Sequence, residues 1–249
     1  MFYYDSFVPN DINGAQLDTF LSLGWYRMNQ YVFCTSHIEH DEQPYRVHWL
    51  RYPISELSAK PSHKRIRNRN RNFQFTIEDL GTIRPDHTEL HKRYRETIIF
   101  NGALSVRDCL FGDYQMDRNI FNTKCISVFD KEKLIAGGYF DLGEESSASI
   151  LHFFDPEYSR YSLGKYLILL TLDYLRDQQY KFYYPGYVVQ GLSKMNYKLF
   201  LGKEHAQYFD PHSISWKNFT GKILNDEKTN GLPGSIENST EAGKVPEPS

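Results

Sequence analysis

The chain has 249 residues, which is enough for one large domain or two small ones with a buried core. Hydrophobic residues make up 40% of the chain and aromatic residues 16%, a composition that excludes a largely disordered protein. The formal net charge of −2 excludes a uniformly basic nucleic-acid-binding protein, so any binding to phosphates depends on local charge.

The first 80 residues are predicted to form a small α+β region. The chain begins MFYYDSFVPN, which has neither the basic segment nor the apolar segment of a signal peptide. Apolar spacing predicts a short helix over Asp18–Leu23 and strands over Tyr31–Phe33 and Tyr45–Leu50. Between the two strands, His37, His40, Asp41 and Glu42 are of the types that bind metals. We predict a solvated polar loop here and no metal site.

A basic stripe follows at His63–Arg71, with the sequence HKRIRNRNR. It contains five Lys or Arg residues and no acid: Lys64, Arg65, Arg67, Arg69 and Arg71. Screening limits charge effects to about 8–10 Å, so such a stripe can bind phosphates on an otherwise neutral protein. Asn68 and Asn70 would then act as neutral donors. A solvated, charged helix surface is an equally open interpretation.

Residues 81–220 are predicted to form a larger domain. In chain order, we expect a helix from Glu89 carrying Leu90, Tyr94 and Ile98, a hairpin of Lys124–Phe129 and Leu134–Phe140, a strand over Ser147–Phe154, a helix over Leu163–Asp177, a strand over Lys181–Tyr184 and a helix around Gly191–Leu199. This order of strands and helices predicts an α+β fold with a mixed β-sheet and flanking helices, preceded by the smaller N-terminal α+β region.

Residues 221–249 are predicted to form a disordered acidic tail. They are rich in Gly, Pro, Ser, Asn and Glu and contain five acids against three lysines, so the rest of the chain is neutral. Elsewhere, the longest apolar run, Leu167–Leu172, is too short to span a bilayer. Cys34, Cys109 and Cys125 have no CxxC spacing and indicate reduced thiols. We expect a cytoplasmic monomer with no membrane contact.

One candidate motif joins the strand over Ser147–Phe154 to the following helix, with the sequence FFDPEYSRYSLGKY. Unpaired N–H groups at a helix N-terminus bind anions, and Gly164 would let a ligand approach the backbone closely. The motif resembles the acyl-donor turn of the GCN5-related N-acetyltransferase (GNAT) fold. It departs from that pattern because Tyr166 occupies the last Gly/Ala position and Arg160 lies one residue early. A helix capped by Ser162 explains the same residues without any ligand.

A second motif, PGYVVQGLSKMNYKLF, resembles the signature of the arginyl-tRNA–protein transferase family. Matching segments in the same order include Asp155-Pro156 with Tyr158, Ser162–Gly164 with Tyr166, the hairpin KEKLIAGGYFDL, Gly24-Trp25 before Tyr31, Lys60–Arg65 and Leu90–Arg95. The resemblance therefore extends from about Ser22 to Leu201 and implies a GNAT-like catalytic domain. Its implied activity is transfer of an amino acid from charged tRNA to the N-terminus of a protein beginning with Asp or Glu.

The resemblance also implies roles for individual residues. The residues expected to position the ester and the amine are Asp155, Ser162, Tyr166, Tyr187, Lys194, Tyr197 and Lys198. The residues expected to bind tRNA are Lys64, Arg65, Arg67, Arg69, Arg71 and Gly164. Met195 is more typical of a core residue than of a residue that contacts a substrate. Asp155, which precedes a proline, is equally typical of a turn. Because the aminoacyl ester of tRNA is already activated, we expect no cofactor.

The N-terminal region departs from the family pattern. The family carries a cysteine set associated with zinc or an iron–sulfur cluster, whereas the corresponding segments here read PNDINGAQLD and TSHIEHDEQPYR. We therefore predict neither a metal nor a redox cluster. The donor amino acid stays open between arginine and leucine. Two other functions also stay open: a GNAT-type acyl-CoA N-acetyltransferase, and a non-catalytic protein that binds tRNA or protein N-termini.

Overall fold

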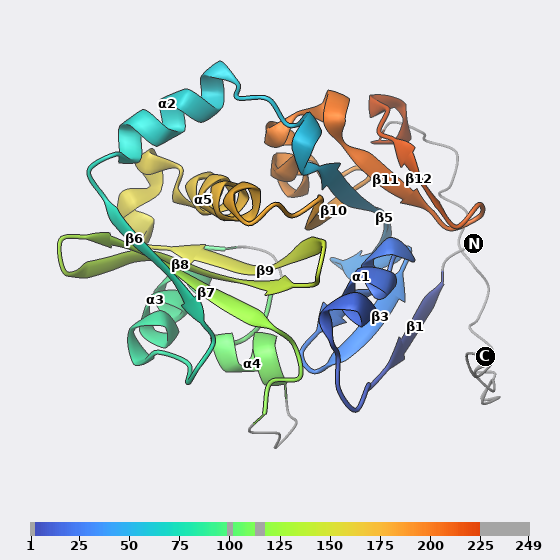
Figure 1. The fold of residues 1–249 in the computed structure, drawn as a ribbon, viewed down its shortest axis with the longest axis horizontal. Helices are drawn as coiled ribbons and strands as arrows, with labels where there is room; N and C mark the ends of the chain where they lie inside the picture. The colour runs from blue at the N-terminus through green and yellow to red at the C-terminus, as the bar shows by residue number, and fades with distance from the viewer. Residues whose placement is uncertain (1–2, 99–101, 113–117, 225–249) are drawn as a thin grey trace.

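The computed structural model describes residues 3–98, 102–112 and 118–224, which form two β-sheets with helices around the larger one (Figure 1). The smaller sheet has the order β1-β3-β2, with β1 at Tyr4–Phe7, β2 at Tyr26–Met28 and β3 at Tyr31–Thr35. Helix α1 (Gly14–Ser22) begins at a capping box between Asn13 and Gln16, which places its start upstream of the predicted helix.

The larger sheet has the order β12-β11-β5-β10-β9-β8-β7-β6, with β4 paired to β5. Its strands are β4 (His37–His40), β5 (Gln43–Pro53), β6 (Gln74–Asp79), β7 (Thr123–Asp130), β8 (Lys133–Leu142), β9 (Ser146–Phe154), β10 (Phe182–Val189), β11 (Gln207–Asp210) and β12 (Ser215–Asn218). Among the described strands, β9 and β10 form the one parallel pair, and the other neighbours are antiparallel. The sheet is therefore mixed.

Helices cover both faces of this sheet (Figure 1). Helices α2 (Pro61–Asn70) and α5 (Leu163–Asp177) lie on one face, and α3 (Pro85–Arg95) and α4 (Val106–Phe111) lie on the other. Short 3-10 helices complete the structure: η1 (Ile54–Glu56), η2 (Pro156–Tyr161), η3 (Ser193–Leu201), η4 (Lys203–His205) and η5 (Gly221–Leu224). The predicted α+β class, a mixed sheet with flanking helices, is confirmed. None of the helices in the described ranges is long and apolar enough to cross a membrane.

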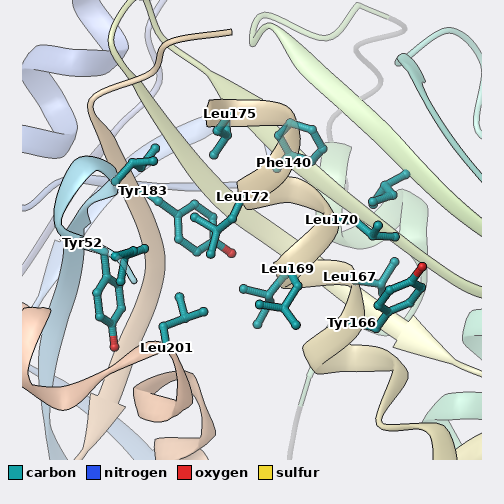
Figure 2. Packing of buried hydrophobic residues seen from close by; sticks show 14 of the residues in the cluster. Tyr52, Phe140, Tyr166, Leu167, Leu169, Leu170, Leu172, Leu175, Tyr183 and Leu201 are labelled. Carbon is teal, nitrogen blue, oxygen red and sulfur yellow. The ribbon is translucent and has the colours of Figure 1, made fainter. Parts of the chain in front are cut away.

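Helix α5 is the centre of the main core. Its residues from Tyr166 to Leu172 are all buried, as expected for a helix covered on more than one side. Figure 2 shows Leu169 and Leu172 close to Tyr183 of β10, with Tyr52 of β5 nearby. On the outer side of α5, Arg67 of α2 pairs with Asp173. The sheet and α2 together account for the burial of α5.

Strands β9 and β10 separate after a short parallel ladder. Phe182–Tyr184 pairs with Ser146–Ala148, but β9 continues to Phe154 without β10 beside it. Pro185 has no N–H to donate, and Gly186 has a φ of +97°, a left-handed conformation that favours glycine. The register of β10 against β5 shifts at these residues. The two strands therefore leave a split in the middle of the sheet.

Several predicted elements are confirmed, and others are wrong. Helix α5 has the predicted bounds, and the hairpin of β7 and β8 is present. The predicted loop at His37–His40 is strand β4, and the predicted helix around Gly191–Leu199 is the 3-10 helix η3. The domain division at residue 80 stays a prediction, although β5 and β6 both pair within the larger sheet. Most of the predicted tail, from residue 225 onward, lies outside the described residues.

Candidate active site

A cavity of about 610 Å³ lies at the split between β9 and β10. Ser149, Leu151 and His152 line it from β9, and Pro185–Tyr187 line it from β10. Further lining residues come from α3, from the first turn of α5 and from η3. The Pro185-Gly186 pair therefore creates the space that the cavity occupies, because it moves β10 away from β9.

One end of the cavity is aromatic. Trp49 of β5 stacks on Tyr26 with ring centroids 3.7 Å apart. Phe33 and Tyr187 pack against Trp49 in T-shaped arrangements, with ring centroids 5.6 and 5.0 Å from that of Trp49. The indole N–H of Trp49 donates to the carbonyl oxygen of Thr35 at 2.8 Å, which fixes the ring. These rings form an apolar wall that is already in place in the absence of a ligand.

Lys198 and His152 provide polar groups in the same cavity. The Nζ of Lys198 donates to the carbonyl oxygen of Tyr187 at 3.1 Å and lies 5.1 Å from the centroid of the Tyr187 ring. Burial lowers the pKa of Lys198 to about 8. Burial, together with the charge of Lys198, lowers the pKa of His152 to about 4, so His152 is neutral near pH 7.

The electrostatic character of the cavity is positive. Lys165, Lys198 and Arg95 line it, and none of its lining residues in the described ranges is Asp or Glu. A fourth cation, Arg27, is neutralised by buried Asp141 at 2.8 Å. Three cations without a carboxylate among the lining residues favour an anionic ligand or one with a partial negative charge.

Five of the predicted site residues line this cavity: Ser162, Gly164, Tyr187, Tyr197 and Lys198. They come from α5, β10 and η3, and the fold brings them together. Ser162 has a left-handed backbone (φ 57°, ψ 42°) at the start of α5, and its side chain makes no capping hydrogen bond. Its hydroxyl is therefore not used as the predicted helix cap.

Two other predicted catalytic residues, Tyr166 and Asp155, do not line the cavity. Tyr166 belongs to the main core, where it is 6% exposed. Asp155 caps η2 and accepts from the N–H of Glu157 at 3.1 Å. Burial opposes its charge, but a hydrogen bond from Lys133 at 3.0 Å, the Glu157 N–H and the charge of Arg93 hold the pKa of Asp155 below its ordinary value. Lys194 lies on η3, and its side chain is outside what the structure describes.

The basic stripe forms α2, on the same face of the sheet as α5 (Figure 1). Arg67 pairs with Asp173 of α5, with Nη2 and Oδ1 2.9 Å apart, and Arg69 donates to the carbonyl oxygen of Arg160 at 2.5 Å. Lys64, Arg65 and Arg71 are exposed. The structure therefore separates the stripe into two arginines that bind neighbouring elements and three cations that face solvent.

Sequence reasoning missed several lining residues. His152 and Trp49 lie in strands whose apolar pattern indicates core, although a histidine within a buried strand is a usable signal. Tyr94 and Arg95 are part of a segment noted for its resemblance to the transferase family, but no site role was assigned to them. Lys165 lies between two predicted site residues, Gly164 and Tyr166, and was also missed.

Comparison with known proteins identifies the family of the region that builds the cavity. Residues 86–207 match the family model described as "Arginine-tRNA-protein transferase, C terminus", which covers the chain from α3 to the start of β11. Beyond this range, β2, β3 and β5 add the aromatic wall.

Curated relatives agree with this match. The chain is 23% identical over 220 residues to the Arabidopsis thaliana protein "Arginyl-tRNA--protein transferase 2", covering 79% of this chain and 36% of the relative. It is 29% identical over 153 residues to the "Aspartate/glutamate leucyltransferase" of Shewanella sp. (strain MR-7), covering 60% of this chain and 62% of the relative. The chain thus spans between about a third and two thirds of the length of these relatives.

Among solved structures, a conserved protein of unknown function from Staphylococcus epidermidis aligns over 83% of this chain and 68% of its own, with 11% identity and a TM-score of 0.43. The family assignment rests on the sequence matches alone. Through the region that carries α3, β9, α5, β10 and η3, this chain is similar to the arginine-tRNA-protein transferase family.

Proposed function

We propose that this protein transfers an amino acid from charged tRNA to the N-terminal amino group of an acceptor protein. The observation that carries the proposal is the position of the cavity. Most of its lining residues lie in the region that matches the transferase family, among them Ser162 and Gly164 at the start of α5 and Tyr187, Tyr197 and Lys198 on the facing elements. Two substrates can therefore meet between α5 and β10.

The proposed chemistry is direct aminolysis. The N-terminal amine attacks the carbonyl carbon of the aminoacyl ester, and the tRNA ribose oxygen leaves. The backbone N–H groups in the first turn of α5 would stabilise negative charge on the ester oxygen. An α-amino group has a pKa of about 7.7–8.0, so a useful fraction is neutral near pH 7. The ester is already activated, and the proposal needs no cofactor beyond charged tRNA.

For the donor, we propose an uncharged amino acid such as leucine in preference to arginine. A donor arginine would bring a guanidinium into a cavity lined by Lys165, Lys198 and Arg95 and by no carboxylate among the described residues. A buried cation without a counter-ion is strongly disfavoured. The aromatic wall around Trp49 instead suits an apolar side chain.

For the acceptor, we propose proteins that begin with Asp or Glu. Two of these cations, Lys165 and Arg95, offer partners for an acidic side chain, and charge-assisted hydrogen bonds of this kind are roughly twice as strong as neutral ones. An acceptor beginning with Lys would instead meet like charge. The cavity therefore favours an uncharged donor side chain and an acidic acceptor side chain.

For tRNA, we propose that the solvent-facing cations of α2 contact the phosphate backbone. Lys64, Arg65 and Arg71 are exposed, whereas Arg67 and Arg69 already bind Asp173 and Arg160. An arginine that holds two helices together cannot leave its partner for a phosphate without loss of that contact. The functional part of the stripe is therefore smaller than its sequence indicates.

Changing Arg65 and Arg71 together to Glu is expected to weaken tRNA binding about tenfold or more. Removal of two phosphate contacts should also reduce the slope of log Kd against log salt concentration by about two. Filter binding over a range of salt concentrations measures both effects. The matched control is Lys131→Glu in the exposed turn between β7 and β8, which makes the same type of charge change away from α2. Equal affinities of the double variant and the control would remove α2 from the tRNA site.

The function itself is tested by transfer of radiolabelled leucine or arginine, each precharged on tRNA, to peptides that begin with Asp, Glu or Ala. We expect label from leucyl-tRNA on the Asp and Glu peptides and little on the Ala peptide. Label from arginyl-tRNA alone would contradict the donor assignment and keep the reaction class. Transfer of acetyl groups from acetyl-CoA, with none from tRNA, would favour an acyl-CoA acetyltransferase.

A further inference from the structure

Lys198 has an unusual position for a lysine. It lies on η3, and its side chain turns back into the split between β9 and β10. The side-chain oxygen of Asn196 joins η3 to β10, because it accepts a hydrogen bond from the N–H of Val189 at 3.0 Å. The Nζ of Lys198 would lie 3.4 Å from a Cβ atom at Gly186. The amino group is therefore held within the cavity by its hydrogen bond to Tyr187 of β10.

The groups that face Lys198 leave its charge uncompensated. On β9 it faces His152, whose Nε2 is buried and has no hydrogen-bond partner among the described residues. On β10 and η3 it faces the rings of Tyr187 and Tyr197, with Nζ 5.1 and 5.6 Å from their centroids. Among the described residues, Nζ makes a hydrogen bond to the carbonyl oxygen of Tyr187 and to no other group. Neutral phenols and a neutral imidazole do not stabilise an ammonium group as a carboxylate does.

This environment changes the protonation of Lys198. Burial lowers its pKa to about 8, whereas an exposed lysine titrates near 10.4. A much larger fraction of Lys198 than of an exposed lysine is then neutral near pH 7.5. A neutral amine can still donate one hydrogen to the Tyr187 carbonyl, and its lone pair is then free to accept a proton.

We propose that Lys198 is the base that takes the proton from the attacking amine and returns it to the departing ribose oxygen, a role that rests on the proposed function. When the neutral α-amine attacks the ester carbonyl carbon, a C–N bond forms and its nitrogen becomes positively charged. Lys198 removes one proton from this nitrogen. The C–O bond to the ribose breaks, and Lys198 donates the proton to that oxygen. The products are an amide and an uncharged tRNA with a free hydroxyl, so atoms and electrons balance.

The test compares two substitutions that separate a base from an anion-binding cation. Lys198→Arg keeps the positive charge but cannot lose its proton, because the pKa of arginine exceeds 12. Lys198→Met removes both properties. We expect both variants to lower kcat by about 100-fold or more, the usual contribution of a general base, with a much smaller change in KM. Lys203→Met is the matched control, because Lys203 is exposed on η4 outside the cavity.

Competitive acetylation of the wild-type protein provides a measurement independent of activity. Trace acetic anhydride is applied over a range of pH, and mass spectrometry follows the peptide that contains Lys198 together with an added model peptide that has one lysine side chain. We expect Lys198 to become reactive around pH 8, well below the pH at which the lysine of the model peptide becomes reactive. Equal titration of Lys198 and the model peptide would overturn the proposal even if both Lys198 variants failed to fold.

The outcomes also separate this role from the function on which it rests. If the wild type transfers the amino acid and Lys198→Arg has a near-normal kcat, Lys198 does not act as a base. Its role would then be to bind an anion by its positive charge. Absence of transfer by the wild type from either charged tRNA contradicts the proposed function, and the role of Lys198 in it then falls as well. Loss of activity in both variants, with early acetylation of Lys198 and an active Lys203→Met, supports the base.

Discussion

Replacing Arg27 by methionine is expected to lower the free energy of unfolding by about 3–5 kcal/mol, because it leaves a buried carboxylate without its partner. The side chain of Arg27 is 1% exposed and that of Asp141 is 0% exposed, with Nη1 and Oδ1 2.8 Å apart. The guanidinium also donates to Thr123 and to the carbonyl oxygens of Asn29 and Leu110. Methionine can replace the volume of this side chain but none of these bonds.

Urea denaturation followed by circular dichroism measures this loss. The matched control is Arg118→Met, which removes an ion pair of similar length (2.9 Å) with Asp11. Arg118 and Asp11 are 71% and 62% exposed, so this change should cost less than about 1 kcal/mol. If both variants lost the same stability, the buried ion pair would have no special role. Adding Asp141→Leu to Arg27→Met is expected to restore part of the loss, since it removes the unpaired charge.

Replacing Gly164 by alanine is expected to lower the rate of transfer roughly tenfold to a hundredfold without loss of stability. A Cβ atom at residue 164 would meet only carbons of the Phe154 ring, at 3.7 and 3.9 Å, which is ordinary van der Waals contact. Alanine is also the better helix former by about 1 kcal/mol. The protein alone therefore accepts the methyl group, and only a substrate close to the first turn of α5 would collide with it.

Steady-state transfer and thermal unfolding together test this expectation. Gly81→Ala is the matched control, because a Cβ atom there meets nothing within 4 Å and Gly81 lies outside the cavity. A Gly164→Ala variant with unchanged kcat/KM would show that neither substrate approaches this turn. Lowered thermal stability of Gly164→Ala would contradict the packing argument. Its activity would then say nothing about how closely a substrate approaches this turn.

The sequence predicts the main helix and the central hairpin well, because their signals are local. Leu163–Asp177 follows a strand end and the Asp155-Pro156 break, and its apolar spacing fits only a helix. The path of β10 is different. Pro185-Gly186 normally ends a strand, but in the structure the chain continues to Val189 by pairing with β5. That partner lies far away in the sequence, and local patterns contain no information about it.

The candidate site shows the same limit. The spacing of Ser162, Gly164 and Tyr166 predicts one cluster, yet Tyr166 is one turn further along α5 and faces the core. In the basic stripe, alternate positions such as Arg65, Arg67 and Arg69 lie about 200° apart around a helix. Arg67 therefore cannot share a face with Arg65 and Arg69, and it contacts α5 while Arg65 is exposed. Whether a motif residue faces a ligand or a neighbouring helix depends on packing.

The position of β5 has a consequence for the order in which the chain folds. Leu50 of β5 lies opposite Gly186 of β10 and Tyr208 of β11, partners that are synthesised long after it. During translation, β4 can pair with the first residues of β5, but the part of β5 after Arg46 leaves the ribosome without its strand partners, and its apolar residues stay exposed until β10 and β11 emerge. Such non-local pairing slows folding and extends the period in which a nascent chain can aggregate. Synthesis in cells should thus depend on chaperones more strongly than the stability of the finished protein would indicate.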